Sequence, residues 1–126
     1  MDAAALGVAR ERSGTVTQRD NIDARALMEM LERGERVTLV DVRKREQHAE
    51  ESIPGSVNYD AYDALHSGDE RAMEGLELSE GERVVTYCNR GTSGAVAAEQ
   101  LRRRGYEAHS LEGGLEAWKD LQRARE

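Results

Sequence analysis

Two apolar runs, each flanked by a helical pattern, constrain the fold of this chain more than any other feature. The runs occupy residues 37–42 and 84–87, and both are rich in β-branched residues. Nearly continuous apolarity is typical of parallel strands that are covered on both faces. A helix that begins after Asp23 and ends at Gly34 is predicted before the first run, and a helix over about 94–104 follows the second. Strands that alternate with helices predict an α/β fold, in which a mostly parallel sheet carries helices on both faces.

The remaining segments predict shorter elements and the limits of one domain. A short strand is expected near 57–59, and Asp60 is a candidate cap for a short helix that ends near Leu65. Residues 1–20 mix small and charged side chains without an apolar period, so we expect an N-terminal extension there. The other expected parts are a helix over 44–50, a strand over 108–111, a helix over 115–122, one domain over 21–122 and a C-terminal tail over 123–126.

Composition excludes several classes of partner and site. The 126 residues include 18 Lys plus Arg and 25 Asp plus Glu, which gives a formal net charge of -7. A negative chain is a poor candidate for binding nucleic acid or an anionic membrane, and no apolar stretch reaches the length of a membrane span. Cys88 is the sole cysteine, so neither an intrachain disulfide nor a metal site of paired cysteines can form. With no recognisable targeting segment, this cysteine usage favours a cytoplasmic location.

The loop that follows the second apolar run is the clearest candidate site. Cys88 stands between a buried strand and the start of a helix, where ligands of open α/β sheets bind. Free N–H groups at a helix start form a positive concavity, which favours the thiolate over the thiol. A cysteine that merely fills the core is the alternative, but a Gly/Ser/Thr/Arg loop favours nucleophilic chemistry on an anion. The candidate substrate-binding residues of this loop are Asn89, Arg90, Gly91, Thr92 and Ser93.

Several segments resemble signatures of the rhodanese-homology domains, the sulfurtransferases. Asp41-Val42-Arg43 is similar to the family's Asp-Val-Arg signature, and Ile53-Pro54-Gly55-Ser56 to its Ile-Pro-Gly-Ala. Tyr87-Cys88 with Gly91 resembles the active loop, and the stretch 105–118 resembles the closing motif. Because the segments follow in family order over roughly residues 22–121, the resemblance implies the three-layer rhodanese fold with a sheet of about five strands.

The resemblance also implies a ping-pong reaction without metal or cofactor. Cys88 would take the outer sulfur of a donor such as thiosulfate or a persulfide and pass it to cyanide or a thiol. Arg90 occupies a position where thiosulfate-using members carry a basic residue. Asp41 and Arg43 are expected to support the loop rather than to react. The implied partners are thus a small anionic donor and a thiophilic acceptor, with a protein in either role as an alternative.

Departures from the family pattern leave some points open. Ser93 stands five residues after Cys88, where many single-domain members carry an arginine that pairs with the aspartate. Arg43 or a loop amide could therefore be the partner of Asp41. Glu51-Ser52 replaces the family's usual Gly-His, and no function is predicted for His48 or His66, which are expected at the surface.

Three other functions remain open at this point. One is a non-catalytic recognition module, although inactive relatives usually lack the cysteine that Cys88 supplies. Another is a sulfur relay between proteins, which the sequence does not separate from an enzyme for small molecules. The third is a cysteine-dependent phosphatase or arsenate reductase, which needs an arginine six positions after the cysteine to clamp the oxyanion. Gly94 stands at that position, so the clamp is absent.

Overall fold

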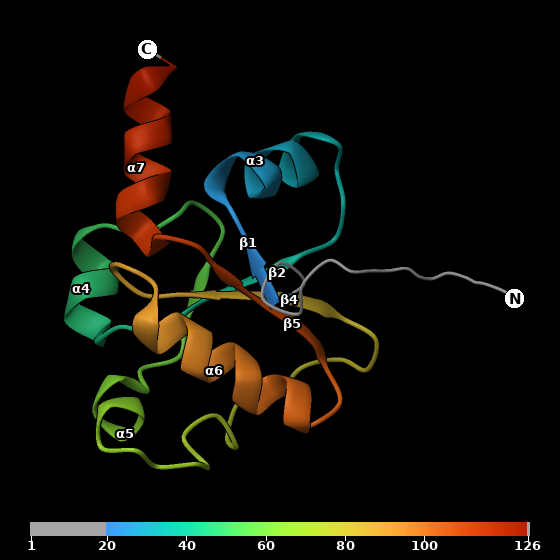
Figure 1. Ribbon diagram of the computed structural model, residues 1–126, viewed down its shortest axis with the longest axis vertical. Coiled ribbons are helices and arrows are strands. Elements are labelled where there is room, and N and C mark those ends of the chain that lie inside the picture. Colours follow the sequence, from blue (N-terminus) through green and yellow to red (C-terminus); the bar gives the residue numbers. More distant parts are fainter. Residues whose placement is uncertain (1–19, 126) are drawn as a thin grey trace, which may run out of the picture.

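A five-stranded parallel sheet forms the middle layer of the protein (Figure 1), whose computed structural model describes residues 20–125. The spatial order is β1-β5-β4-β2-β3, and all four pairings are parallel. This confirms the predicted α/β class and the parallel sheet. The strands are β1 (Asn21–Ile22), β2 (Thr38–Asp41), β3 (Val57–Asn58), β4 (Arg83–Tyr87) and β5 (Glu107–Leu111).

Helices cover both faces of this sheet. In Figure 1, α3 and α7 lie on one side of the strands, and α5 and α6 lie on the other. The helices are α3 (Ala24–Glu32), α4 (Arg45–Glu50), α5 (Tyr62–His66), α6 (Thr92–Arg103) and α7 (Gly114–Ala124). Between residues 20 and 125, none of them is both long and apolar enough to cross a membrane. The extension predicted over residues 1–20 lies, except for Asp20, outside the described residues.

The central strand β4 divides the core into two halves. Val84 packs toward α5 and α6, whereas Val85 and Tyr87 pack toward α3 and α7. Successive side chains of a strand point to opposite faces, so a strand buried on both faces must be apolar throughout. Leu101 of α6 and Leu27 of α3 are fully buried on the two faces. The continuous apolar runs seen in the sequence thus follow from this layered arrangement.

Local signals account for the helix starts, with one correction. Asp23 caps α3 as predicted, since its Oδ1 accepts the N–H of Ala26 at 2.8 Å. Asp60 was the candidate cap of α5, but its Oδ2 instead accepts the N–H of Arg45 at 3.0 Å, and Ala61 stands at the start of α5. The carboxylate therefore serves the free amides of α4, a helix that is near in space although 15 residues earlier in the chain.

The ends of β2 and β4 set the position of the candidate site. Asp41 and Tyr87 are paired neighbours in the sheet, and the N–H of Val42 donates to the carbonyl of Tyr87 at 3.0 Å. The carboxyl ends of both strands therefore meet at the same edge. As a result, Arg43 and Cys88, which are far apart in the sequence, leave the sheet side by side.

Candidate active site

The Cys88 sulfur lies in a cup of main-chain amides. The N–H of Gly91 donates to Sγ at 3.0 Å, and the N–H of Gly94 donates at 3.4 Å. Gly91 has a φ of 119°, a conformation that side-chain-bearing residues rarely adopt, and this lets the chain curl so that its amide faces the sulfur. Cys88 is only 6% exposed and also borders the core beneath α6. Two main-chain N–H groups therefore point at the sulfur from the loop and the start of α6.

The loop ends at Gly94, which packs closely against the backbone of β4. A Cβ atom on residue 94 would lie 3.1 Å from the Cα of Tyr87, which is tighter than ordinary contact. Thr86 of β4 also binds the backbone of Gly94, since its hydroxyl donates to the carbonyl of Gly94 at 2.6 Å. This close approach brings the first amides of α6 to the sulfur. A side chain at residue 94, such as the arginine that a cysteine-dependent phosphatase needs, would crowd the backbone of β4.

The first turn of α7 supports the loop from behind. The N–H of Leu115 donates to the carbonyl of Cys88 at 2.8 Å, and the N–H of Glu116 donates to the carbonyl of Asn89 at 3.0 Å. The starts of α6 and α7 accordingly lie next to each other in Figure 1. The two carbonyls point toward α7, so the amides that follow in the loop are free to face the sulfur.

A buried ion pair lies beside the loop and answers which group is the partner of Asp41. The guanidinium of Arg43 contacts the Asp41 carboxylate through Nε at 3.0 Å and through a terminal nitrogen at 2.7 Å. The backbone N–H of Arg43 adds a hydrogen bond of 2.9 Å. Burial by itself raises the pKa of Asp41, but the hydrogen bonds from Arg43 and His48 outweigh it and lower that pKa below its ordinary value. The carboxylate therefore stays ionised, and Arg43 is its ion-pair partner.

The remaining loop residues differ in their surroundings. Arg90 is exposed and has no hydrogen bond or ion pair within the described part of the chain. Thr92 is exposed, whereas Ser93 is 7% exposed. The hydroxyl of Ser93, a candidate substrate-binding residue, lies 3.1 Å from Nε2 of His66. Arg90 is thus the one charged residue of the loop over residues 89–93, and it is exposed.

Two histidines near this site were not predicted to take part. His48 places Nδ1 2.9 Å from Asp41, and His66 contacts Ser93. His48 lies only seven residues from Asp41, but His66 and Ser93 are 27 residues apart, so no local pattern could have indicated the second contact. Among residues 20–125, no cluster of three or more His, Cys, Asp or Glu side chains is placed to hold a metal ion.

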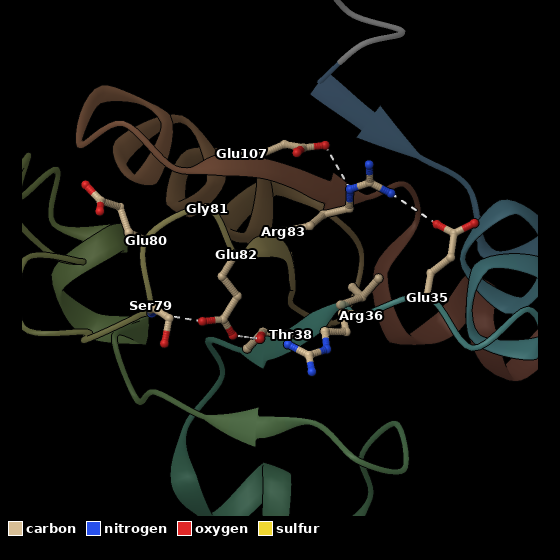
Figure 2. A pocket seen from close by; sticks show the side chains of 10 residues that line it. Glu35, Arg36, Thr38, Ser79, Glu80, Gly81, Glu82, Arg83 and Glu107 are labelled. Atoms are coloured by element: carbon tan, nitrogen blue, oxygen red, sulfur yellow. Dashed lines mark hydrogen bonds and ion pairs between the residues drawn. The ribbon is translucent and has the colours of Figure 1, made fainter.

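A hollow in the surface lies at the opposite end of the strands. It has a volume of about 790 Å³ and is lined by Thr38, Arg83 and Glu107, which begin β2, β4 and β5. Figure 2 shows Arg83 between two carboxylates, with Glu107 at 2.8 Å and Glu35 at 3.2 Å. Arg83 is therefore already paired within this hollow, and ligands of parallel sheets bind at the other edge. This hollow is not the candidate active site.

Known proteins resemble this chain in sequence. A family model described as the rhodanese-like domain matches residues 23–121. The Bacillus subtilis protein YtwF, which carries a provisional sulfurtransferase name, is 32% identical over 98 residues, covering 77% of this chain and 87% of that protein. A tRNA sulfurtransferase of Desulfurococcus amylolyticus is 30% identical over 77 residues. The match covers 61% of this chain but only 14% of that enzyme, so the two differ greatly in length.

Solved structures resemble the fold. The rhodanese-like domain from Anabaena superposes with a TM-score of 0.65 at 30% identity, over 81% of this chain and 74% of that one. A human single-domain sulfurtransferase has the same TM-score at 24% identity, over 80% of this chain and 96% of that one, and this likeness shows the fold alone. From the family match, the parallel sheet and the order of its elements, the chain belongs to the rhodanese-like domain family.

Proposed function

We propose that the protein is a sulfurtransferase that carries sulfane sulfur on Cys88. The observation that carries this proposal is the pair of amides, from Gly91 and Gly94, that donate to Sγ. A thiolate and a persulfide are both anions, and fixed N–H donors stabilise negative charge without needing to reorganise. The sulfurtransferase names of the relatives support the same activity.

The reaction divides into two half-reactions that balance in atoms and charge. In the first, the Cys88 thiolate attacks the outer sulfur of thiosulfate, the S–S bond of the donor breaks, and sulfite leaves with the bonding electrons. In the second, a cyanide ion or a thiolate attacks the outer sulfur of the Cys88 persulfide. The new bond gives thiocyanate or a new persulfide, and the Cys88 thiolate is restored. A reducing compartment such as the cytoplasm suits a site that depends on a free thiolate.

Arg90 is the residue that we propose for recognising an anionic donor. Its charge is exposed and unpaired within the described residues, in contrast to the charge of Arg43, which Asp41 neutralises. The chain as a whole carries a net charge of -7 and therefore repels small anions. A single exposed cation two residues after Cys88 thus has a larger share in attracting the donor than it would in a neutral protein.

A macromolecular acceptor is the second candidate for the later half-reaction. Relatives include a tRNA sulfurtransferase and an adenylyltransferase and sulfurtransferase of Lodderomyces elongisporus. The chain corresponds to 14% and 19% of those proteins. Its negative charge disfavours RNA as a direct partner, because phosphate contacts need a positive surface. A thiol, free or on a protein, therefore fits this chain better than tRNA.

A thiosulfate and cyanide assay tests the proposal on the wild type and on Cys88→Ser. We expect thiocyanate formation by the wild type and none by the variant. Mass spectrometry after incubation with thiosulfate should show the mass of one added sulfur atom on the wild type alone. Full activity of Cys88→Ser would overturn the assignment. Absence of any sulfur adduct on the wild type with thiosulfate, and with a low-molecular-weight persulfide as donor, would favour a recognition module.

A further inference from the structure

A chain of polar contacts runs from α4 to the Cys88 loop. Nδ1 of His48 lies 2.9 Å from the Asp41 carboxylate, whose other contacts come from Arg43. A terminal nitrogen of Arg43 then donates to the side-chain oxygen of Asn89 at 3.1 Å. Three segments of the chain, α4, the end of β2 and the catalytic loop, are joined in this way. The two middle members are buried, with 0% exposure for Asp41 and 3% for Arg43.

Arg43 is held in one orientation. Its Nε and one terminal nitrogen bind Asp41, and the same terminal nitrogen also donates to the carbonyl of Glu51. The other terminal nitrogen points to Asn89. Because a guanidinium is planar and its donors are fixed relative to one another, Asp41 determines where the last donor points. The Asp41 carboxylate is ionised and can only accept, so Nδ1 of His48 carries the hydrogen. It donates to Oδ2, the same oxygen that the terminal nitrogen of Arg43 contacts.

Asn89 directly follows the nucleophile and is fixed by both its side chain and its backbone. Its side-chain oxygen accepts from Arg43, and its carbonyl accepts from Glu116. The far end of the loop is fixed separately, where Gly94 packs on β4. Gly91 lies between Asn89 and Gly94, so the direction of its N–H depends on how both of these residues are held.

We propose that Asn89 and His48 are positioning residues of the Cys88 site. Acting through the Arg43–Asp41 pair, they hold the loop in the conformation in which its amides face Sγ. Neither residue touches the sulfur by a hydrogen bond in the described part of the structure, and neither belongs to the signatures that identify the family here. A role of these two residues in sulfur transfer rests on the proposed function. Their effect on the reactivity of Cys88 does not depend on that function.

Alkylation of the cysteine by iodoacetamide tests the inference directly. Cys88 is the sole cysteine, so the alkylation rate and the ultraviolet absorbance of the thiolate report this residue alone. We expect Asn89→Leu to slow alkylation near neutral pH about tenfold, the effect of one lost hydrogen bond to a charged group. His48→Phe should slow it about threefold, whereas His48→Asn, which keeps an N–H donor, should restore most of the rate. Glu50→Ala, an exposed change on the same helix, is the control and should leave the rate unchanged.

The double variant shows whether Asn89 and His48 act through one hydrogen-bond network or act on Cys88 independently. Residues of one hydrogen-bond network are energetically coupled, so Asn89→Leu with His48→Phe should react no slower than Asn89→Leu alone. Circular dichroism and the urea midpoint verify that each variant is folded under the assay conditions, and Asn89→Ala replaces Asn89→Leu if the latter does not fold. Wild-type alkylation rates in the Asn89 variants, or rate losses that multiply in the double variant, would overturn the inference. A protein that shows the expected alkylation pattern but transfers no sulfur would refute the proposed function and leave this inference standing.

Discussion

The α-carbon of Gly114 packs directly against the carbonyl oxygen of Cys88. A Cβ atom on residue 114 would lie 2.4 Å from that oxygen and 2.7 Å from the carbonyl carbon of Asn89. This contact lets the first turn of α7 reach the loop, where the N–H of Leu115 binds the Cys88 carbonyl. The close approach of α7 therefore depends on a residue without a side chain at position 114, which lies directly against the backbone of Cys88.

We expect Gly114→Ala to impair both folding and activity. The added methyl group must push α7 away from the loop, and the φ of 60° at this position adds backbone strain. Overpacking of this kind typically costs about 1–3 kcal/mol, and the displaced loop should lose most of its sulfur transfer. Urea unfolding and the thiosulfate assay measure the two effects.

Gly34→Ala is the matched control for this substitution. Gly34 also has a positive φ, of 78°, but a Cβ atom there would meet nothing within 4 Å. Only the backbone strain remains, about 1 kcal/mol, and activity should be unaffected. Equal losses in the two variants would show that the contact with the Cys88 carbonyl has no importance of its own.

Arg90→Ala should raise the KM for thiosulfate about fivefold, in line with one exposed charge interaction. The KM for an uncharged donor, such as an organic trisulfide, should change little. Raising the salt concentration should shrink the difference between wild type and variant, because exposed charges are screened. Arg25→Ala, which removes an exposed arginine from α3, serves as the control. Equal effects on charged and uncharged donors would show that Arg90 only shapes the loop.

Asp41→Asn should destabilise the protein by about 3 kcal/mol at neutral pH, since it leaves Arg43 buried without its counter-charge. The pKa of Asp41 is lowered in the folded state, so the folded chain binds this proton less tightly than the unfolded chain. Its contribution is therefore complete above the unfolded value of about 3.9 and is lost as the pH falls through the lower folded value.

Urea unfolding at a series of acidic pH values measures this contribution. The wild type should lose stability steeply below about pH 4, whereas Asp41→Asn should show a shallower acid dependence. Asp120→Asn removes an exposed carboxylate on α7 and should change the free energy of unfolding by less than about 0.5 kcal/mol. An acid dependence that is the same in the wild type and in Asp41→Asn would contradict the assignment.

Tyr87→Phe should destabilise the protein by about 2 kcal/mol. The buried hydroxyl of Tyr87 accepts the N–H of Ile53 at 3.1 Å and lies 2.8 Å from the hydroxyl of Ser56. Its removal leaves a buried N–H without a partner, which typically costs about 1–3 kcal/mol. Ser56→Ala keeps the contact of Ile53 with Tyr87 and should cost about 1 kcal/mol or less. Thermal or urea unfolding of both variants gives the comparison, and a larger loss for Ser56→Ala would contradict this account.

The fold could be predicted from the sequence because its signals are local. The apolar runs that became β2 and β4 are buried on both faces, and Ala97, Ala98 and Leu101 face inward on α6 as their spacing indicates. Short elements were harder, since a two-residue strand such as β1 has no periodicity of its own. Trp118, the last residue of the stretch that resembles the closing motif, is only partly buried and lines two surface hollows beside α7.

The candidate site could be predicted only in part. The position of Cys88 between a strand and a helix follows from the order of elements, and the family signatures gave the extent of the loop. The hydrogen-bond partners of Asn89 and Ser93 could not be predicted, because Arg43 is 46 residues from Asn89 and His66 is 27 residues from Ser93. Spacing along the chain carries no information about such pairs.

The sequence by itself determined the α/β class, the family and the cysteine on which the proposed chemistry depends, because hydrophobic period and short motifs are properties of consecutive residues. Only the tertiary structure decided that Arg43 binds both Asp41 and Asn89. It also decided that Ser93 contacts His66 and that α7 packs against the Cys88 loop at Gly114. The physical reason is that these contacts depend on the paired ends of separate strands and on distances of closest approach, which exist only once the sheet and its helices have packed.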